Sequence, residues 1–208
     1  MKQCAKYASL CRSRKNGFSL VELVLSLAVL LIITTLAVPV VVRSLQTYQL
    51  NSTASQLAGM LKFTRFGAIR QNTPVSCQIA QQGANWLVWV DLNGNSVADA
   101  TEPQMIVSGS STLLPASSVP STATIASTLG AASSYSWTVL PGSSQSITYD
   151  QRGVVVTSAG GPVTTNINVL YVGNPNDPNS GYRAIITLPS GAVQVWTASS
   201  AGNWQRVS

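Results

Sequence analysis

The hydrophobic pattern of this chain begins with one long, almost uncharged run. From Phe18 to Val42 nearly every position is apolar, and the one charged residue is Glu22. As a helix this run is about 37 Å long, which exceeds the hydrocarbon core of a bilayer at about 30 Å. The apolar region of a secretory signal is shorter, at about 7–15 residues. The pattern therefore predicts a transmembrane helix over residues 18–42.

Beyond Val42 the apolar positions recur at helical spacing among polar residues. They are Leu45, Tyr48, Leu50, Ala54, Leu57, Leu61 and Ile69. This period predicts an amphipathic helix over residues 43–72, which continues the helix that begins at Phe18 and presents one face to a globular body. The helix is expected to end near Gln71, because Thr73 precedes a proline and residues before proline avoid the α region.

Short apolar runs separated by turn residues follow and predict strands. The expected strands are Val75–Ala80, Trp86–Val90, Gln104–Val107, Ser146–Tyr149, Val154–Thr157, Asn166–Val172, Tyr182–Leu188 and Ala192–Thr197. The first two should form a hairpin. One long helix followed by strands predicts an α+β fold, in which the helix packs on an antiparallel β-sheet in a body over residues 73–208.

One region of the body has no clear pattern. Residues 108–145 lie in a stretch without any charged residue and are rich in Ser, Thr, Ala, Gly and Pro. Such a composition suits an exported surface. The sequence leaves two interpretations open: a long variable loop, or extra strands such as Ser134–Leu140.

The net charge of +6 is concentrated at the N-terminus. Of the twelve Lys and Arg residues five precede Gly17, which leaves seven against six Asp and Glu. The rest of the chain is therefore nearly neutral, which argues against nucleic-acid binding by the body. Lys62, Arg65 and Arg70 are expected to form a solvated or subunit-facing edge of the helix. The basic leader over residues 1–17 places the N-terminus in the cytoplasm and the body outside.

The residue types that catalysis needs are scarce. The chain has no histidine, so the usual general base and the commonest metal ligand are missing. Cys4 and Cys11 lie in the leader, and Cys77 is the single cysteine beyond it. We interpret Cys77 as a small buried hydrophobic residue. The sequence predicts no enzyme activity, no cofactor and no small-molecule substrate.

The junction between the leader and the apolar run has an unusual arrangement. An acid such as Glu22 costs about 3 kcal/mol at the centre of a bilayer and less near its edge, so it needs a partner. Cleavage after Gly17 would give Phe18 a new α-amine one helical turn from Glu22. The carboxylate could pair with that amine or with the amine of a neighbouring copy. A glycine suits the cleavage position, because a residue without Cβ lets an extended chain lie close to a protease.

The sequence GFSLVEL at residues 17–23, with a basic leader before it and a long apolar run after it, resembles the prepilin processing motif of type IV pilins and type II secretion pseudopilins. The resemblance implies that a membrane prepilin peptidase cuts after Gly17 and N-methylates Phe18. It also implies that Glu22 neutralises the N-terminus of an adjacent subunit during filament assembly.

The body extends this resemblance. The stretch LKFTRFGAIRQNTPVSC at residues 61–77, the following hairpin with Trp86 and Trp89, and the strands around Gly191 look like H-type pseudopilins (general secretion pathway protein H) and the related T-type minor pilins. The resemblance implies a pilin-like fold and a minor pseudopilin of a type II secretion system. Such a subunit is anchored in the bacterial inner membrane, has its body in the periplasm and assembles with other pilin-type subunits into a pseudopilus that drives protein secretion.

Two alternatives to the secretion pseudopilin stay open. One is a type IV minor pilin that serves pilus assembly, adhesion, twitching or DNA uptake. The other belongs to a different class, a membrane-anchored binding module that is never cleaved.

The loop DLNGNSVADATE is a candidate calcium site. Asp91, Asn93, Asn95, Asp99 and Glu102 occupy positions 1, 3, 5, 9 and 12 of a calcium-type loop. However, Ser96 stands where an EF-hand needs glycine, and the flanking segments read as strands. Asp and Asn are also common in loops because they bond to their own backbone, so a plain Asx-rich loop without metal is the favoured interpretation.

The resemblance to T-type minor pilins also implies a candidate nucleic-acid site, because some of them bind DNA near the C-terminus of the body. Arg183 and Arg206 are the candidate phosphate contacts, with Trp196 and Trp204 as candidate stacking partners. Two arginines give little affinity for phosphate, so we expect no nucleic-acid binding and interpret the tryptophans as core residues.

Overall fold

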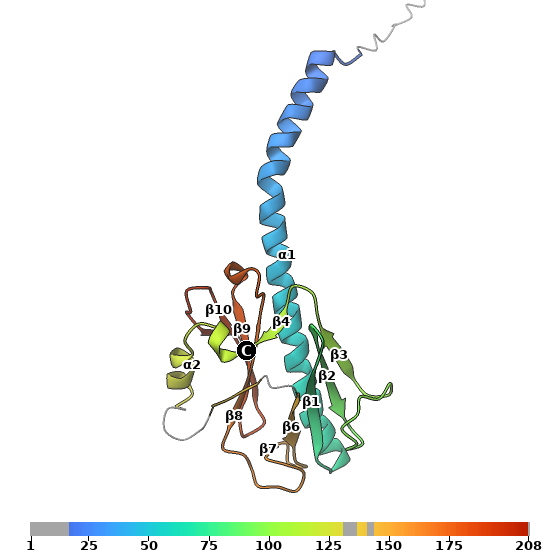
Figure 1. The fold of residues 1–208 in the computed structure, drawn as a ribbon, viewed down its shortest axis with the longest axis vertical. Helices are drawn as coiled ribbons and strands as arrows, with labels where there is room; N and C mark the ends of the chain where they lie inside the picture. The colour runs from blue at the N-terminus through green and yellow to red at the C-terminus, as the bar shows by residue number, and fades with distance from the viewer. Residues whose placement is uncertain (1–16, 131–136, 141–143, 208) are drawn as a thin grey trace, which may run out of the picture. The chain divides into compact units, whose positions relative to one another are not determined.

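The computed structural model describes residues 17–130, 137–140 and 144–207. The chain forms two compact units that meet between Val42 and Arg43. Helix α1 (Leu20–Gln71) belongs to both, with Pro39 inside it (Figure 1). The predicted long N-terminal helix is therefore confirmed, although it begins at Leu20 and not at Phe18.

The C-terminal end of α1 is set by a residue in the left-handed conformation. Asn72 has φ of 52°, and the N–H of Thr73 donates to the carbonyl of Ala68 at 3.3 Å. This is the hydrogen-bond pattern of a Schellman cap, and Asn is one of the few residues besides glycine that adopt it readily. Pro74 then directs the chain into the first strand, as the sequence predicted.

Five strands form one sheet, called sheet A, in the order β3-β2-β1-β6-β7. They are β1 (Val75–Gln82), β2 (Asn85–Asp91), β3 (Gln104–Val107), β6 (Ser144–Tyr149) and β7 (Val155–Val156). The predicted hairpin of β1 and β2 is present, but its turn is tighter than expected. Gln82 pairs with Asn85, and the intervening Gly83 has φ of 62°. Both strands are longer than the sequence predicted because the ladder continues to the turn.

The second sheet, sheet B, has the order β11-β10-β9-β8-β4, with β5 paired to β8. Its strands are β4 (Thr112–Leu114), β5 (Trp137–Leu140), β8 (Ile167–Gly173), β9 (Tyr182–Thr187), β10 (Val193–Ala198) and β11 (Gln205–Arg206), and the short helix η2 (Pro178–Ser180) joins β8 to β9. Strand β5 falls in the candidate strand Ser134–Leu140, whose residues 134–136 lie outside the described residues. β5 runs parallel to β8, so sheet B is not purely antiparallel.

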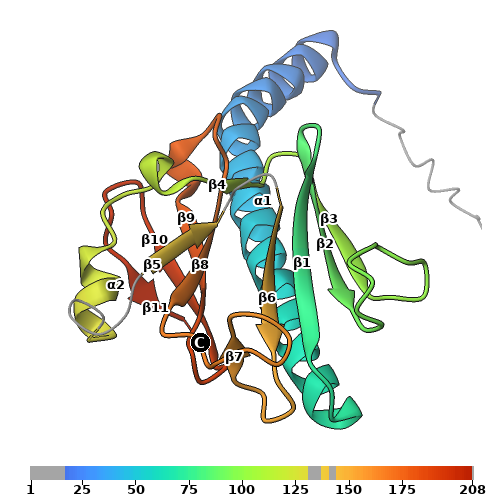
Figure 2. The same cartoon turned by 60° about the horizontal axis from the view of Figure 1, so that its bottom comes forward.

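Both sheets pack on the part of α1 that follows Val42, and Figure 2 shows them on two sides of the helix. The shared core contains Leu50, Ala54, Leu57 and Leu61 of α1, Cys77, Ile79, Val88 and Val90 of sheet A, and Leu170, Val172 and Ile185 of sheet B. The prediction of a buried helix face is therefore confirmed for Leu50, Ala54, Leu57 and Leu61. It is wrong for Leu45 and Tyr48, which are 56% and 71% exposed, because the first buried residue of the helix is Leu50. It is also wrong for Ile69 in the last turn, which is 43% exposed.

The far face of sheet B has a second core. It is covered by the chain from β4 through the short helices η1 (Ala116–Ser118) and α2 (Ala123–Thr128), and Ile125 of α2 is fully buried. Trp196 and Trp204 are each 3% exposed in this core, so the prediction that they are core residues is confirmed. Over its described residues, the low-charge region 108–145 is therefore built of short elements that either extend sheet B, as β4 and β5 do, or cover its far face, as η1 and α2 do.

Candidate functional site

The predicted cleavage junction lies ahead of the first turn of α1. Residues 17–19 are not helical, and the N–H of Leu23 donates to the carbonyl of Ser19 at 3.1 Å. Phe18 is 79% exposed, and space is open around Gly17. Glu22 is exposed in the first helical turn. The Gly17–Phe18 bond thus lies outside the helix and is accessible, as a peptidase substrate must be.

Residues 20–42 of α1 expose apolar side chains on every face. By length and composition, α1 is able to cross a membrane. The few hydroxyls in this segment bond to the helix itself: Thr35 Oγ1 donates to the carbonyl of Leu31 at 2.7 Å, and Ser26 Oγ donates to the carbonyl of Leu23 at 2.9 Å. These bonds lower the cost of hydroxyl groups in lipid. This unit therefore suits lipid or other helices as its surroundings.

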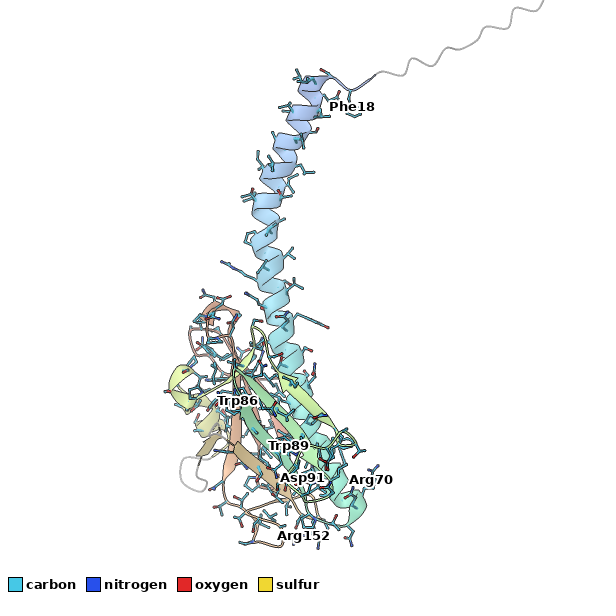
Figure 3. All side chains as sticks on the ribbon, turned by 45° about the vertical axis from the view of Figure 1, so that its right-hand side comes forward. Phe18, Arg70, Trp86, Trp89, Asp91 and Arg152 are labelled. Carbon is cyan, nitrogen blue, oxygen red and sulfur yellow. The ribbon has the colours of Figure 1, made fainter. Side chains whose placement is uncertain are left out.

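In the loop after β2, the carboxylate of Asp91 organises the backbone. Its Oδ1 accepts hydrogen bonds from the N–H groups of Gly94 at 2.7 Å and Asn95 at 3.1 Å, and its Oδ2 accepts one from Ser96 at 2.9 Å. Asp91 is only 3% exposed. Ser96 has φ of 59°, the left-handed conformation that glycine supplies in an EF-hand. Figure 3 labels Asp91 and Trp89 of β2.

The other residues of the candidate calcium loop also bond to one another. Asp99 Oδ2 accepts from the side-chain amides of Asn93 at 2.7 Å and Asn95 at 2.9 Å. Glu102 Oε1 accepts from the N–H of Leu92 at 2.8 Å. The structure thus brings the predicted residues together, with protein donors on their oxygens. Among the described residues, no group of three or more His, Cys, Asp or Glu is placed to hold a metal ion. A calcium site here stays a prediction.

The two candidate phosphate contacts have different environments. Arg183 is 7% exposed; its Nε donates to Asn51 Oδ1 of α1 at 2.7 Å, and its Nη1 donates to the carbonyl of Tyr182 at 2.8 Å. Burial lowers the pKa of this guanidinium. Arg206 is exposed on the edge strand β11. Arg183 therefore joins sheet B to α1, and the two arginines do not form one surface cluster.

Arg65 is a residue whose role the sequence did not indicate. It was expected on a solvated or subunit-facing edge of the helix, but it is half-buried and bonds within the body. Its Nε donates to the carbonyl of Gly153 at 2.9 Å, and its Nη2 reaches the carbonyl of Ser190 at 3.4 Å. Gly153 follows β6 of sheet A, and Ser190 follows β9 of sheet B. One side chain of α1 therefore holds turns of both sheets, which a linear pattern cannot predict.

Cys77 lies in the core beside Thr64, and the prediction that it is a buried hydrophobic residue is confirmed. It is fully buried, and burial raises its pKa to about 12 despite a hydrogen bond with Thr64. Such a thiol is a poor nucleophile. A groove of about 310 Å³ beside β6 and β7 is lined by hydroxyl, amide and aliphatic side chains, without a charged group.

The fold and the junction together define a class: an α+β protein with an apolar helical anchor and a prepilin-type N-terminus. The chain belongs to the family described as Type II transport protein GspH, whose profile matches residues 53–191. A second profile, the prokaryotic N-terminal methylation motif, matches residues 12–38 and so includes Gly17, Phe18 and Glu22. The predicted relationship to the H-type pseudopilins is confirmed.

Among solved structures, the chain is similar to the type IV minor pilin FimU of Pseudomonas aeruginosa. One crystal form is 17% identical with a TM-score of 0.45, covering 76% of this chain and 97% of FimU. A second form is 16% identical with a TM-score of 0.35, covering 77% and 90%. No curated protein sequence matches.

Proposed function

We propose that the chain is a minor pseudopilin of a type II secretion system. The observation that carries this proposal is the N-terminal junction. Gly17 and Phe18 are non-helical and exposed shortly before α1, Glu22 lies in the first helical turn, and all three fall within the methylation motif. Membership of the GspH family favours the secretion system over other filament machines.

In this proposal the chemistry is done to the protein and not by it. The chain inserts with its N-terminus in the cytoplasm and its body in the periplasm. Prepilin peptidase cuts after Gly17 and methylates the new amine of Phe18. Residues 18–42 then pack among the helices of other pilin-type subunits, and no enzyme activity or cofactor is needed.

Glu22 has a defined role in this assembly. A carboxylate in the apolar part of a helix is costly without a partner. The α-amine of an adjacent subunit provides a partner of opposite charge in a medium of low dielectric constant, where the attraction between the two charges is strong. Pairing therefore favours one axial offset between neighbouring helices, which fixes the register of the filament.

The test of the proposal is the intact mass and N-terminal sequence of the protein from its native membranes. We expect a chain that starts at N-methylated Phe18. A chain that retains residues 1–17 in cells with an active prepilin peptidase would instead favour the uncut anchored binding module.

The choice of machine needs a second experiment. Deletion of the gene should trap exoproteins in the periplasm and leave type IV pili unaffected. Loss of pili, twitching or DNA uptake with normal secretion would favour the alternative, a type IV minor pilin.

A further inference from the structure

The carboxylates of the body are at least partly buried and accept hydrogen bonds from other groups of the body. Asp91, Glu102 and Asp150 are 3%, 6% and 8% exposed, and each accepts hydrogen bonds from backbone N–H groups. Asp99 and Asp177 are half-buried and also accept hydrogen bonds. All five carboxylates from Arg43 onward lie in the described part of the chain, and none of them is exposed.

The basic side chains behave in the opposite way. Exposed in the body are Arg43, Lys62, Arg70, Arg152 and Arg206. Arg152 pairs with Asp150 at 2.8 Å but leaves 70% of its side chain accessible, whereas Asp150 leaves only 11%. The nearly neutral composition therefore does not describe the surface of the body, where the exposed charged side chains from Arg43 onward are basic.

Three of these cations lie around an exposed apolar cluster at the C-terminal end of α1. We define the helix-end face as Lys62, Phe63, Phe66, Ile69 and Arg70. The three apolar side chains are 42%, 64% and 43% exposed, and their spacing places them on one side of the helix.

Arg152 borders the helix-end face. The next residue, Gly153, approaches Ile69 so closely that a Cβ there would lie 2.7 Å from Ile69 Cδ1. Figure 3 shows Arg70 and Arg152 at the same end of the body. Large exposed apolar side chains with a charged rim are typical of protein interaction sites, and aromatic and Arg residues dominate the energy of such sites.

We propose that the helix-end face binds an acidic surface on a different pilin-type subunit of the same filament. This inference rests on the proposed function and names the chemistry of the partner. The phenylalanines would supply buried apolar area, while Lys62, Arg70 and Arg152 would select a partner rich in carboxylates and fix its orientation.

A second copy of this chain does not meet this requirement. The exposed charged side chains of its body are basic, so contact between the bodies of two copies would bring like charges together, and such contacts are unfavourable. Nucleic acid also fits poorly, because three cations around aliphatic and phenyl groups neutralise few phosphates. The charge distribution thus selects a heterotypic protein contact.

The test is site-specific photo-crosslinking in native membranes, with p-benzoylphenylalanine at position 66 of the full-length chain. We expect one main adduct with a subunit that has its own prepilin-type N-terminus, and the cross-linked peptide should lie beside Asp or Glu residues. Arg70→Glu should lower the yield about ten-fold. An Asp/Glu→Lys change beside the cross-link in the partner should restore the yield of Arg70→Glu.

Two matched variants control this experiment. Arg206→Glu makes the same charge change on β11 and should leave the yield unchanged, and Arg70→Lys keeps the charge and should retain most of it. The melting temperature of each variant shows whether it is folded. An adduct with a second copy, with DNA or with lipid alone would overturn the inference, as would an equal yield from the native chain and Arg70→Glu.

A parallel photo-crosslinker at Val29 in the membrane helix separates this inference from the proposed function. If Phe18 is methylated and position 29 forms adducts while position 66 forms none, the helix-end inference fails alone. If the leader is retained and neither position forms adducts, the proposed function fails as well.

Discussion

Gly191 lies where a turn of sheet B meets a turn of sheet A. It has φ of 78°, and a Cβ at this position would collide with the carbonyl oxygen of Gly153 and lie 2.9 Å from Arg65 Nε. Gly83, in the β1–β2 turn, has a similar φ of 62° but open space around its missing Cβ. The two glycines therefore separate the cost of a left-handed backbone from the cost of close packing.

We predict that Gly191→Ala lowers the free energy of unfolding by about 3 kcal/mol, and Gly83→Ala by about 1 kcal/mol. In both variants the alanine is strained by the left-handed backbone conformation. Only in Gly191→Ala must the Gly153 carbonyl and the Arg65 side chain also shift to make room for the new Cβ. Thermal unfolding of the full chain in detergent measures the difference. Equal losses would show that the two turns can separate without cost.

Asp91 is the second residue whose role can be tested. Removing its carboxylate by Asp91→Ala leaves three backbone N–H groups without their acceptor, and we predict a loss of about 2 kcal/mol in the free energy of unfolding. Asp177→Ala is the matched control, because Asp177 is half-buried and its side chain accepts one backbone bond, from Asn179 at 3.2 Å. Its loss should be clearly smaller.

The same melting experiment tests the calcium hypothesis. Because protein donors already satisfy Asp91, Asp99 and Glu102, we expect the same melting temperature in excess calcium and in chelator. A rise in calcium that Asp91→Ala abolishes would show that the loop binds the metal.

At the scale of elements, the turn from β6 to β7 is held by Asp150. Burial raises the pKa of this carboxyl, but hydrogen bonds from the Arg152 side chain and from the backbone of Val154 and Arg152, together with the Arg152 charge, outweigh it, so the pKa is lowered from 3.8. A lowered pKa in the folded state stabilises the fold above the unfolded pKa of about 3.9. That contribution is lost as the pH falls through the folded value.

We therefore predict that Asp150→Asn unfolds at a lower temperature than the native chain at pH 7. The difference should begin to shrink below about pH 4, near the unfolded pKa, and should vanish as the pH falls through the lower folded pKa, where the native carboxyl itself becomes protonated. Melting curves from pH 7 to pH 2 measure this. If the difference in melting temperature stays constant over this pH range, the negative charge of Asp150 does not stabilise the turn.

The elements predicted correctly are those with a strong period or a strong terminator. The apolar run and the amphipathic stretch predicted α1, and Thr73 before Pro74 marked its end. Strand β3 was predicted with its observed bounds, and β9 and β10 within a residue at each end. These segments combine β-branched residues with flanking turn residues, so local sequence is sufficient for them.

The elements that were missed depend on tertiary contacts. Strand β4 has three residues and helix α2 has six, too few to show a period. Ile125 is buried because sheet B presents a second apolar face, which a strand pattern does not reveal until its partners are known. In the candidate sites, the burial of Arg183 against Asn51 and the Arg65 contacts join residues far apart in sequence, so spacing alone could not indicate them.

At the scale of the whole molecule, the fold separates charge by sign. The Asp and Glu side chains of the body accept hydrogen bonds inside loops and turns, whereas five Lys and Arg side chains remain exposed. A sequence with almost equal numbers of both signs beyond the leader therefore produces a basic body, and this asymmetry is what gives the helix-end face its predicted partner chemistry. Composition alone concealed it, because net charge does not record which groups are buried.

The cysteines connect the fold to the processing of the whole chain. Cys4 and Cys11 precede Gly17, so the proposed cleavage would remove both and leave Cys77 alone. Because burial raises the pKa of Cys77 to about 12 from 9.0, its thiolate fraction near pH 8 falls about 1,000-fold and reagents cannot reach it.

We predict that the processed chain has no reactive thiol when folded and one in denaturant, whereas an uncut chain has three in denaturant. Maleimide labelling followed by intact mass counts them, with Cys77→Ser as the control that should give none in the processed chain. Rapid labelling of the folded processed chain would contradict the burial of Cys77, and three thiols in denatured protein from native membranes would contradict cleavage after Gly17.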